Sequence, residues 1–251
     1  MSETRRTFVK TATPRTRLDA EADGLAALRP TGTVRVPETL AQGERGLTLE
    51  WVDLRPLDAR SGAALGSALA ALHHAAAGER FGWHRDNFIG PTPQRNAWCT
   101  EWAEFFRERR LRPQFELAAA NGHGGALQRD GDRLLDRVDA LLAGHDPAAS
   151  LLHGDLWGGN AGALPDGTPV IFDPAVYIGD RESDVAMTEL FGRLPESFYA
   201  AYRDAYPLDH DYALRRELYN LYHLLNHLNL FGEAYRVRCG RAVASLLAQT
   251  R

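Results

Sequence analysis

A short β-hairpin pattern interrupts a long helical part of the chain, and it constrains the fold more than any other feature. Residues 159–164 and 169–172 are apolar runs separated by a Pro-Asp-Gly turn. The first residues of one hairpin strand lie beside the last residues of the other. Asn160 is near the start of the first strand and Asp173 directly follows the second, so the two are expected to be neighbours. A third acceptor, Asp155, stands five residues before Asn160. A rigid hairpin among helices is a good place to hold functional loop residues.

The chain divides into two regions of different character. The first 54 residues predict strand, helix, strand, strand, with a strand ending at Lys10, a helix over 18–28 and strands over 34–36 and 47–52. After Arg55 the spacing of apolar residues is mainly helical. The further elements expected are helices at 63–77, 98–120, 127–142, 183–194 and from 212 to the C-terminus, and a strand at 150–152.

This pattern predicts an α+β fold of two lobes. We expect a small N-terminal lobe with a β-sheet over residues 1–54, and a larger, mainly helical lobe over 55–251 that contains the hairpin. With 44% apolar residues in 251, the chain can bury a core of that size.

Charge and cysteine content exclude several classes of protein. A formal net charge of −4 argues against a general binder of nucleic acid or anionic membranes. Cys99 and Cys239 cannot make a disulfide framework, and the sequence has no cysteine and histidine cluster with zinc-ligand spacing. The first ten residues lack an apolar signal region, and eighteen apolar residues never run together. We expect a cytoplasmic protein, a monomer or weak homodimer, that binds a small-molecule or protein-linked substrate.

Lys10 is the only lysine among 29 lysine and arginine residues. An arginine-biased chain could retain one lysine by chance. The alternative is that a compact ammonium on a flexible stem is needed at this strand end, where a planar guanidinium would not fit. Glu21, on the following helix, is the carboxylate best placed to hold it, and Asp19 is the competing choice.

The spacing around the hairpin is typical of phosphoryl transfer. Asn160 and Asp173 offer two hard oxygen ligands that suit Mg²⁺ shared with substrate phosphates. Protein kinases have the same arrangement: an Asp such as Asp155, an Asn five residues later such as Asn160, and a following strand that ends in an Asp such as Asp173. The match is a variant, because Gly154 replaces the kinase arginine and Pro174 follows Asp173. Such chemistry needs a metal, a cation on the phosphates and an oriented hydroxyl, so we predict a kinase that uses ATP and Mg²⁺.

The segment between the lobes is the expected hinge. Residues 50–52 connect the last small-lobe strand to the helical lobe, and backbone groups of Glu50 and Val52 are expected to contact adenine.

With these residues in place, the sequence resembles the fructosamine kinase, or ketosamine-3-kinase, family within the aminoglycoside phosphotransferase-like group of kinase folds. The similarity spans nearly the whole chain. The HGDxxxxN pattern alone marks only the wider group, whereas Trp157 with the block from Asp86 to Asn96 is more specific. The residues that carry the resemblance are His153–Asn160, Phe172–Ala175, Gly179–Asp184, Asp86–Asn96, Phe105–Leu111 and Leu225–Gly232.

The resemblance implies ATP-dependent phosphorylation of a sugar hydroxyl in a ketosamine, a fructosamine or ribulosamine adduct. The phosphorylated adduct then breaks down and frees the amine, which implies a role in protein deglycation. The residues implied are Asp155 as catalytic base, Asn160 and Asp173 as Mg²⁺ ligands, and Lys10 and Glu21 as the phosphate-positioning pair.

Other residues of the motifs are expected to contact the substrate or support the loop. Trp157 is expected to stack against the sugar, with packing under the loop as the alternative. His153, Asp180 and Asp184 are expected to lie behind the ligands, with Asp184 bracing the catalytic loop. Asp180, Glu182 and Asp184 would also suit an outer metal shell, unless Asp180 or Ser183 simply caps the next helix.

The front of the chain departs from the family pattern. A kinase-like small lobe needs roughly 25–30 residues before its lysine strand for two strands and a Gly-rich turn, whereas nine precede Lys10. Either the chain begins inside the domain or the phosphates lack their usual lid, and the Lys10 strand is then expected to be an exposed sheet edge.

Alternative functions remain open from the residues alone. One is a non-catalytic binding protein that keeps the kinase fold, and another is a kinase of the aminoglycoside or choline type. His223 and His227 share a helical face but lack a third ligand, which favours a polar seam over a metal site. His73 and His74, in an alanine-rich helix, are expected to be structural.

Overall fold

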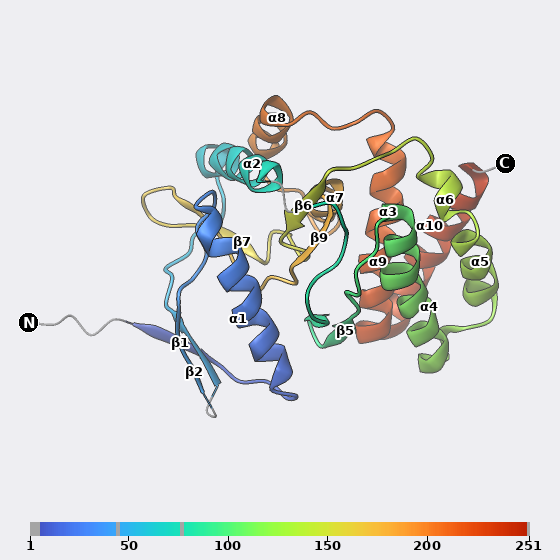
Figure 1. Cartoon of the computed structure of the whole chain (residues 1–251), viewed down its shortest axis with the longest axis horizontal. Helices are drawn as coiled ribbons and strands as arrows, with labels where there is room; N and C mark the ends of the chain where they lie inside the picture. The colour runs from blue at the N-terminus through green and yellow to red at the C-terminus, as the bar shows by residue number, and fades with distance from the viewer. Residues whose placement is uncertain (1–5, 44–45, 76–77, 250–251) are drawn as a thin grey trace, which may run out of the picture.

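The structure is a computed structural model that describes residues 6–43, 46–75 and 78–249. Figure 1 shows a small sheet with one long helix beside it at the N-terminal end, and a much larger helical part that contains the C-terminus. Short paired strands lie between these two parts. The predicted α+β, two-lobed, protein-kinase-like fold is confirmed, while the boundary at residue 54 stays a prediction.

The small lobe is a three-stranded antiparallel sheet packed against one helix. The strands are β1 (Thr7–Lys10), β2 (Thr39–Gly43) and β3 (Gly46–Glu50), in the order β1-β3-β2. The apolar positions of α1 (Thr16–Leu28) face the sheet, and a left-handed Gly32 closes the 3₁₀ turn that follows. In the described part of the sheet β1 is an edge strand, as predicted, and Phe8 and Val9 on it are exposed.

The helical lobe contains nearly all the remaining helices that the structure describes. Helix α2 begins with a capping box, in which Asp58 and Ser61 exchange hydrogen bonds between side chain and backbone. The elements are α2 (Ala59–His74), α3 (Trp102–Phe105), a π-helical segment (Phe106–Leu111), α4 (Arg112–Ala118), a second π-helical segment (Ala119–His123), α5 (Ala126–Leu135), α6 (Val138–Leu141), α7 (Glu182–Met187), α8 (Glu196–Ala205), α9 (Tyr212–Phe231), a 3₁₀ turn (Gly232–Tyr235) and α10 (Arg236–Gln249).

Three two-stranded antiparallel ladders lie in this lobe. Two of them, β4 with β5 and β7 with β8, are hairpins, and the third pairs β6 with the later strand β9. The strands are β4 (Asn87–Ile89), β5 (Thr92–Gln94), β6 (Ala149–Leu152), β7 (Ala161–Ala163), β8 (Pro169–Ile171) and β9 (Tyr177–Asp180).

Several sequence-based boundaries were wrong. Residues 34–36 form no strand, because Pro37 ends the run and only Arg35 pairs, in one parallel bridge with Val170. The predicted strand at 47–52 stops at Glu50. The helix at 183–194 stops at Met187, and the helix from 212 is broken at Gly232, whose φ is +77°. Strands β2, β4, β5 and β9 and helix α8 were not predicted from the sequence.

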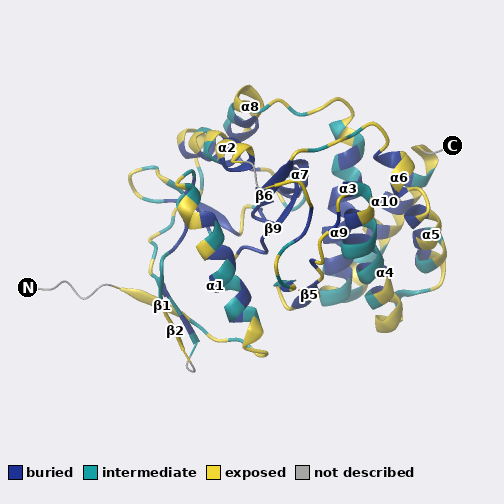
Figure 2. Cartoon of the chain, viewed as in Figure 1, coloured by how far each residue is buried: buried dark blue, intermediate teal, exposed yellow. Residues whose placement is uncertain are grey.

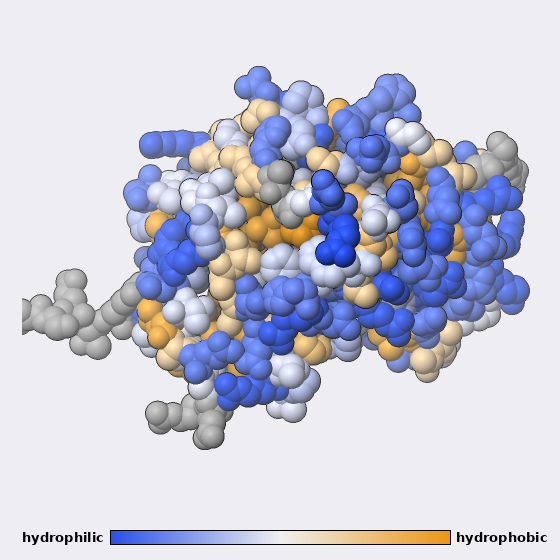
Figure 3. Space-filling model, in the orientation of Figure 1, coloured by the Kyte–Doolittle hydropathy of each residue, from blue (hydrophilic) through white to orange (hydrophobic). Residues whose placement is uncertain are grey.

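The core runs through the middle of the molecule. Figure 2 shows β6, β9 and the inner side of α9 as buried, whereas β1 is exposed. On the face shown in Figure 3 the helices of the large lobe are mainly hydrophilic, and apolar surface gathers between the two parts. Within the described ranges, no helix is both long enough and apolar enough to cross a membrane.

Candidate active site

A cavity of about 550 Å³ between the lobes collects the predicted catalytic residues. Strand β1 and helix α1 form one wall, and the loops at the open end of the β7–β8 hairpin form the opposite wall. The predicted residues that line it are Lys10, Glu21, Asp155, Trp157, Asn160 and Asp173.

The β7–β8 hairpin brings the two predicted metal ligands together. Ala161 pairs with Ile171, and just beyond this pair the N–H of Phe172 donates to the carbonyl of Asn160 at 3.1 Å. Asn160 and Asp173 are therefore held at the same end of the ladder, which confirms that they are neighbours. Asp173 has a left-handed backbone with φ of +57°.

Asp155 lies on the same loop, next to Asn160. The side-chain amide of Asn160 donates to the backbone carbonyl of Asp155 at 2.9 Å and to its carboxylate Oδ2 at 3.2 Å. The pKa of Asp155 is raised to about 7, chiefly by burial and also by the negative charges of Asp173 and Asp184, against the opposing effect of this amide. A carboxylate with that pKa is suited to accept a proton near neutral pH.

Lys10 reaches into the cavity from β1. Its ammonium donates to Glu21 Oε1 at 2.6 Å and pairs with Asp173 Oδ1. Burial alone would lower the pKa of Lys10, but the two carboxylates outweigh it and the pKa is raised. The competing residue Asp19 instead accepts from Gln42 at 2.5 Å, so the partner on α1 is Glu21.

The catalytic loop is held from behind by Asp184 on α7. Its carboxylate accepts the backbone N–H of His153 at 2.7 Å and of Gly154 at 2.8 Å. The Nε2 of His73, on α2, lies 3.3 Å from the same carboxylate. Asp184 therefore accepts hydrogen bonds from the backbone of the catalytic loop, as a residue that braces the loop would.

His153 connects the catalytic loop to the residue that follows β8. Its Nε2 is 3.0 Å from the carbonyl of Phe172, and its Nδ1 accepts the N–H of Asp155 at 3.3 Å. These partners fit a neutral ring protonated at Nε2, and burial lowers the pKa of His153 in agreement.

Gly154 is required by two features of the loop. Its φ is +83°, and a Cβ at this position would lie 2.1 Å from the carbonyl oxygen of Ala175. The N–H of Ala175 in turn donates to the carbonyl of His153 at 2.8 Å. The loop before Asp155 and the segment after Asp173 therefore touch backbone to backbone, which only glycine permits.

Trp157 lies at the cavity wall and also packs on the loop, while its stacking against a sugar stays a prediction. Its half-buried indole lines the cavity, makes an edge contact with Phe191 at 6.2 Å between ring centroids and packs over Gly159. One side of the ring supports the loop while the side chain stays at the cavity wall.

The expected hinge residues lie at the end of β3. The Glu50 carboxylate accepts from Arg35 at 2.5 Å and from the N–H of Glu38 at 3.1 Å. Neither Glu50 nor Val52 is among the residues lining the cavity. The contact of their backbone groups with adenine therefore stays a prediction.

Three features of the site were missed from the sequence. Arg17 lines the cavity from α1, where its spacing from Glu21, one helical turn, was a usable signal. His73 reaches Asp184 from a distant helix, which no local pattern indicates. Asn87, Phe88 and Gly90 of the β4–β5 hairpin also line the cavity.

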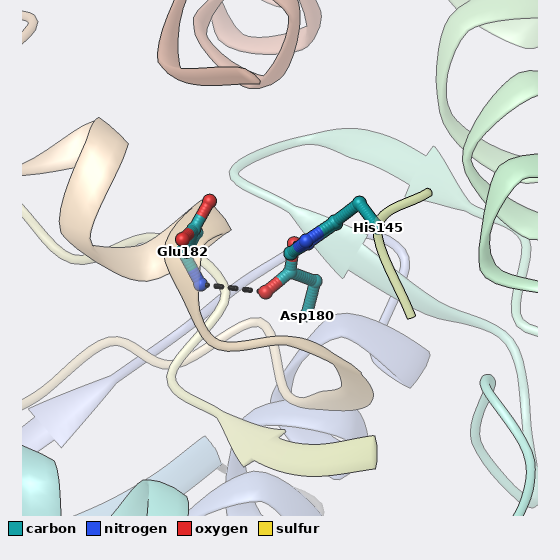
Figure 4. A group of neighbouring side chains, drawn as sticks. All are labelled: His145, Asp180 and Glu182. Atoms are coloured by element: carbon teal, nitrogen blue, oxygen red, sulfur yellow. Dashed lines mark hydrogen bonds and ion pairs between the residues drawn. The ribbon is translucent and has the colours of Figure 1, made fainter. Parts of the chain in front are cut away.

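A second cluster of titratable residues lies away from the cavity. Ligand atoms of His145, Asp180 and Glu182 lie within 4.8 Å of one another, as drawn in Figure 4. All three already have partners: Asp180 Oδ2 accepts from His145 at 2.7 Å, and Glu182 accepts twice from Arg215, at 2.6 and 3.1 Å. The dashed line marks the N–H of Glu182 donating to Asp180 Oδ1 at 3.0 Å. Asp180 thus caps α7, which favours the capping alternative over an outer metal shell.

Comparisons with known proteins agree with this geometry. The sequence model of the fructosamine kinase family matches residues 1–249. A "probable ketoamine kinase" from Synechocystis is 46% identical over 221 residues, covering 86% of this chain and 74% of the relative. A chloroplastic protein-ribulosamine 3-kinase from Oryza sativa is 39% identical, covering 87% of this chain and 65% of the relative.

A crystal structure from Thermobifida fusca, provisionally named a fructosamine-3-kinase, has a TM-score of 0.89 at 35% identity and covers 97% of this chain and 86% of its own. The predicted resemblance and enzyme class are confirmed: this chain belongs to the fructosamine kinase family, a family of phosphotransferases with a protein-kinase-like fold.

Proposed function

We propose that this protein transfers the γ-phosphoryl group of ATP to a sugar hydroxyl of a ketosamine. The observation that carries the proposal is that Lys10, Asp155, Asn160 and Asp173 line one cavity, although they come from two lobes. A non-catalytic binding protein has no need of all four. Membership of the fructosamine kinase family, and relatives named for ketoamines and ribulosamines, favour a ketosamine over an aminoglycoside or choline as the acceptor.

In this proposal Asp155 orients the acceptor hydroxyl and takes its proton. The Asn160 amide contacts both the carbonyl and the carboxylate of Asp155, which fixes the direction of the carboxylate. The raised pKa of Asp155, about 7, lets it accept a proton as the hydroxyl attacks and release it afterwards.

The donor set of the cavity fits Mg²⁺. Asp173 offers a carboxylate whose side chain is 45% exposed. The Asn160 amide donates through its nitrogen to Asp155, which leaves its Oδ1 as the oxygen ligand. Hard oxygen donors with room for substrate oxygens are what Mg²⁺ prefers. When bound there, Mg²⁺ would neutralise charge on the transferred phosphoryl group.

Lys10 supplies the second positive charge. Its ammonium is oriented by Glu21 from α1, so it stays on the cavity side of the sheet. An ammonium placed there stabilises negative charge that develops on the phosphates.

Trp157 is placed to contact the sugar of the substrate. A sugar hydroxyl at Asp155 would place the sugar beside Trp157, whose indole is at the same cavity wall. Phosphorylation of a fructosamine or ribulosamine adduct would be followed by its breakdown, so the protein would act in deglycation.

The test measures ATP consumption by the purified protein with fructoselysine, ribuloselysine and a glycated protein. We expect Mg²⁺-dependent turnover with at least one of them, and a loss of roughly 10³-fold or more in kcat for Asp155→Asn with nucleotide binding retained. Asp166→Asn is the matched control, because Asp166 caps the exposed turn of the same hairpin by accepting the N–H of Thr168 at 2.9 Å. Equal activity of wild type and Asp155→Asn would remove Asp155 from the reaction.

A further inference from the structure

The block from Asp86 to Asn96, which carries much of the family resemblance, contains no residue with a role in the proposed chemistry. It forms the β4–β5 hairpin, closed by a tight turn at Gly90. Three of its amide side chains are almost completely buried: Asn87 is 3% exposed, Gln94 2% and Asn96 0%. Buried amides are costly unless every polar atom is hydrogen-bonded, so their partners indicate what they do.

Two of these amides donate to the segment that follows Asp173. The Asn87 amide donates to the carbonyl of Val176 at 2.7 Å, and the Gln94 amide donates to the carbonyl of Ala175 at 3.1 Å. The carbonyl of Ala175 is also the group that lies against Gly154 of the catalytic loop. The hairpin therefore holds the backbone two and three residues beyond Asp173.

A second layer of donors fixes the direction of these amides. Asn87 Oδ1 accepts from both Gln94 and Asn96, each at 2.8 Å, and Gln94 Oε1 accepts from the hydroxyl of Tyr222 at 2.7 Å. Since each acceptor atom is occupied by a donor, the NH₂ groups of Asn87 and Gln94 must face the carbonyls.

The layer ends at a buried arginine. The Arg110 guanidinium, 0% exposed, donates to Asn96 Oδ1 at 2.8 Å and stacks over the ring of Tyr177, 3.9 Å from its centroid. Tyr177 follows directly after Val176, so the same network contacts three consecutive residues, Ala175, Val176 and Tyr177.

Asp173 itself needs this support. Its φ of +57° is uncommon for a residue other than glycine and costs free energy unless neighbouring structure holds it. The residue after it is Pro174, whose ring lacks an N–H with which to anchor the backbone. The next two residues, Ala175 and Val176, are those held by Gln94 and Asn87.

We infer that the buried amide network of the β4–β5 hairpin positions Asp173 for cation binding, by clamping residues 175–176 so that Asp173 keeps its left-handed backbone and faces the cavity. Asn87 and Gln94 are positioning residues in this scheme, because they act through the backbone and not on the phosphates. The inference rests on the proposed function only for the identity of the cation, Mg²⁺ with ATP.

The test compares Gln94→Met with Gln114→Met. Both glutamines are buried, at 2% and 3% exposure, but Gln114 accepts from Asn229 at 2.8 Å in the α4–α9 interface, and no hydrogen bond joins it to residues 173–176 within the described ranges. It meets the network only at the hydroxyl of Tyr222, whose own donation to Gln94 does not depend on it. Hydrogen exchange of the metal-free protein reports whether the segment is clamped, through the N–H of Ala175. Binding of a non-hydrolysable ATP analogue with and without Mg²⁺ reports the consequence for the site.

We expect faster exchange over residues 173–176 and a roughly 10-fold weaker Mg²⁺-dependent component of nucleotide binding in Gln94→Met, with the KM for the ketosamine unchanged. Gln114→Met leaves the bonds of Gln94 and Asn87 to residues 175–176 in place, so it should change both quantities far less than Gln94→Met, even if it loses as much thermal stability. Tyr222→Phe, which keeps the ring and removes the donor to Gln94, should show the same effects at smaller size and serves if Gln94→Met does not fold.

Two results would overturn the inference. One is unchanged exchange over 173–176 in both Gln94→Met and Tyr222→Phe. The other is faster exchange with unchanged Mg²⁺ dependence, which would separate the clamp from the cation site. Wild-type protein whose nucleotide binding does not depend on Mg²⁺ would instead contradict the proposed function, while the exchange result would still decide whether the clamp exists.

Discussion

The carboxylate of Asp184 accepts the backbone N–H of Gly154 at 2.8 Å, so a side chain of α7 fixes the loop that presents Asp155. Asp184→Asn replaces one acceptor oxygen with a donor that faces an N–H. We expect the free energy of unfolding to fall by about 3 kcal/mol and kcat to fall at least tenfold. Urea denaturation and steady-state kinetics measure the two effects.

Glu182→Gln is the matched control for that variant. Glu182 is equally buried on the same helix, but its carboxylate pairs with Arg215 and not with the loop. It should lose similar stability with kcat nearly unchanged in the folded fraction. Equal losses of kcat in both variants would show that Asp184 acts only on stability.

Gly154→Ala should be far more harmful than Gly158→Ala in the same loop. At Gly154 a methyl group would lie 2.1 Å from the carbonyl oxygen of Ala175 with φ at +83°, whereas at Gly158 the nearest described atom is a Leu194 methyl at 3.9 Å. We expect a loss of roughly 3 kcal/mol for the first and under about 1 kcal/mol for the second. Similar melting temperatures for the two variants would contradict this account of the loop.

Trp157→Ala should raise the KM for the ketosamine more than the KM for ATP. The indole is at the cavity wall beside Asp155, and stacking of an aromatic ring on a sugar or its linker is lost with it. We expect roughly a tenfold effect, measured with both substrates varied. Trp98→Ala is the control, since Trp98 is 40% exposed and outside the cavity lining. A change confined to the KM for ATP would place Trp157 on the nucleotide side.

Arg17→Gln should weaken nucleotide binding. Arg17 lines the cavity, and its buried Nε lacks a hydrogen-bond partner among the described residues, which leaves a donor for phosphates. Its positive charge also acts on Glu21. We expect a several-fold rise in the Kd for MgATP, partly restored in Arg17→Lys. Arg15→Gln, which removes an exposed charge paired with Asp19 at 3.8 Å, is the control and should leave the Kd unchanged. Equal Kd values for all four proteins would exclude Arg17 from the phosphate site.

His223 should make the fold sensitive to acid. Burial lowers its pKa to about 3, helped by His227 and Arg110 and opposed by Asp184, whereas an unfolded histidine titrates near 6.5. Between these values the unfolded chain binds a proton that the folded protein does not, so stability is full above pH 6.5 and falls as the pH drops toward 3. The expected contribution is about 2 kcal/mol lost at pH 5 relative to pH 8.

His223→Gln removes this titration while keeping a polar side chain of similar size. Urea denaturation at pH 5 and pH 8 should show a smaller difference between the two pH values for the variant than for the wild type. An identical difference would mean that other groups cause the acid sensitivity.

Local sequence pattern predicted the elements whose contacts are local. The α1 helix, the β7–β8 hairpin and β1 were expected close to where they are, because periodic apolar residues and turn residues define them. Strand β2, with the polar sequence TLAQG, carries no such pattern and exists because β3 pairs with it. Strand β9 likewise depends on a partner, β6, that lies 25 or more residues earlier in the chain.

Some residues of the candidate site could likewise be predicted from local sequence, whereas others depend on contacts between distant parts of the chain. Asp155, Asn160 and Asp173 could be found from their spacing around one hairpin, and Lys10 from its rarity. The partner of Lys10 was left between Asp19 and Glu21, since both are on the first turns of α1 and only the packed helix shows which one faces β1. His73 contacts the side-chain carboxylate of Asp184, and the buried amides of β4–β5 contact backbone carbonyls. In each case the partner lies more than 80 residues away, which no spacing reveals.

The sequence by itself determined which chemical groups are available: the ammonium of Lys10 on a strand of the small lobe, and two carboxylates and an amide in a kinase-like order around one hairpin. The tertiary structure alone decided what those groups can do, because burial shifts the proton affinity of Asp155 and because a left-handed Asp173 exists only while distant side chains hold the residues after it. Residue identity is a local property, whereas desolvation and backbone support are properties of the packed chain.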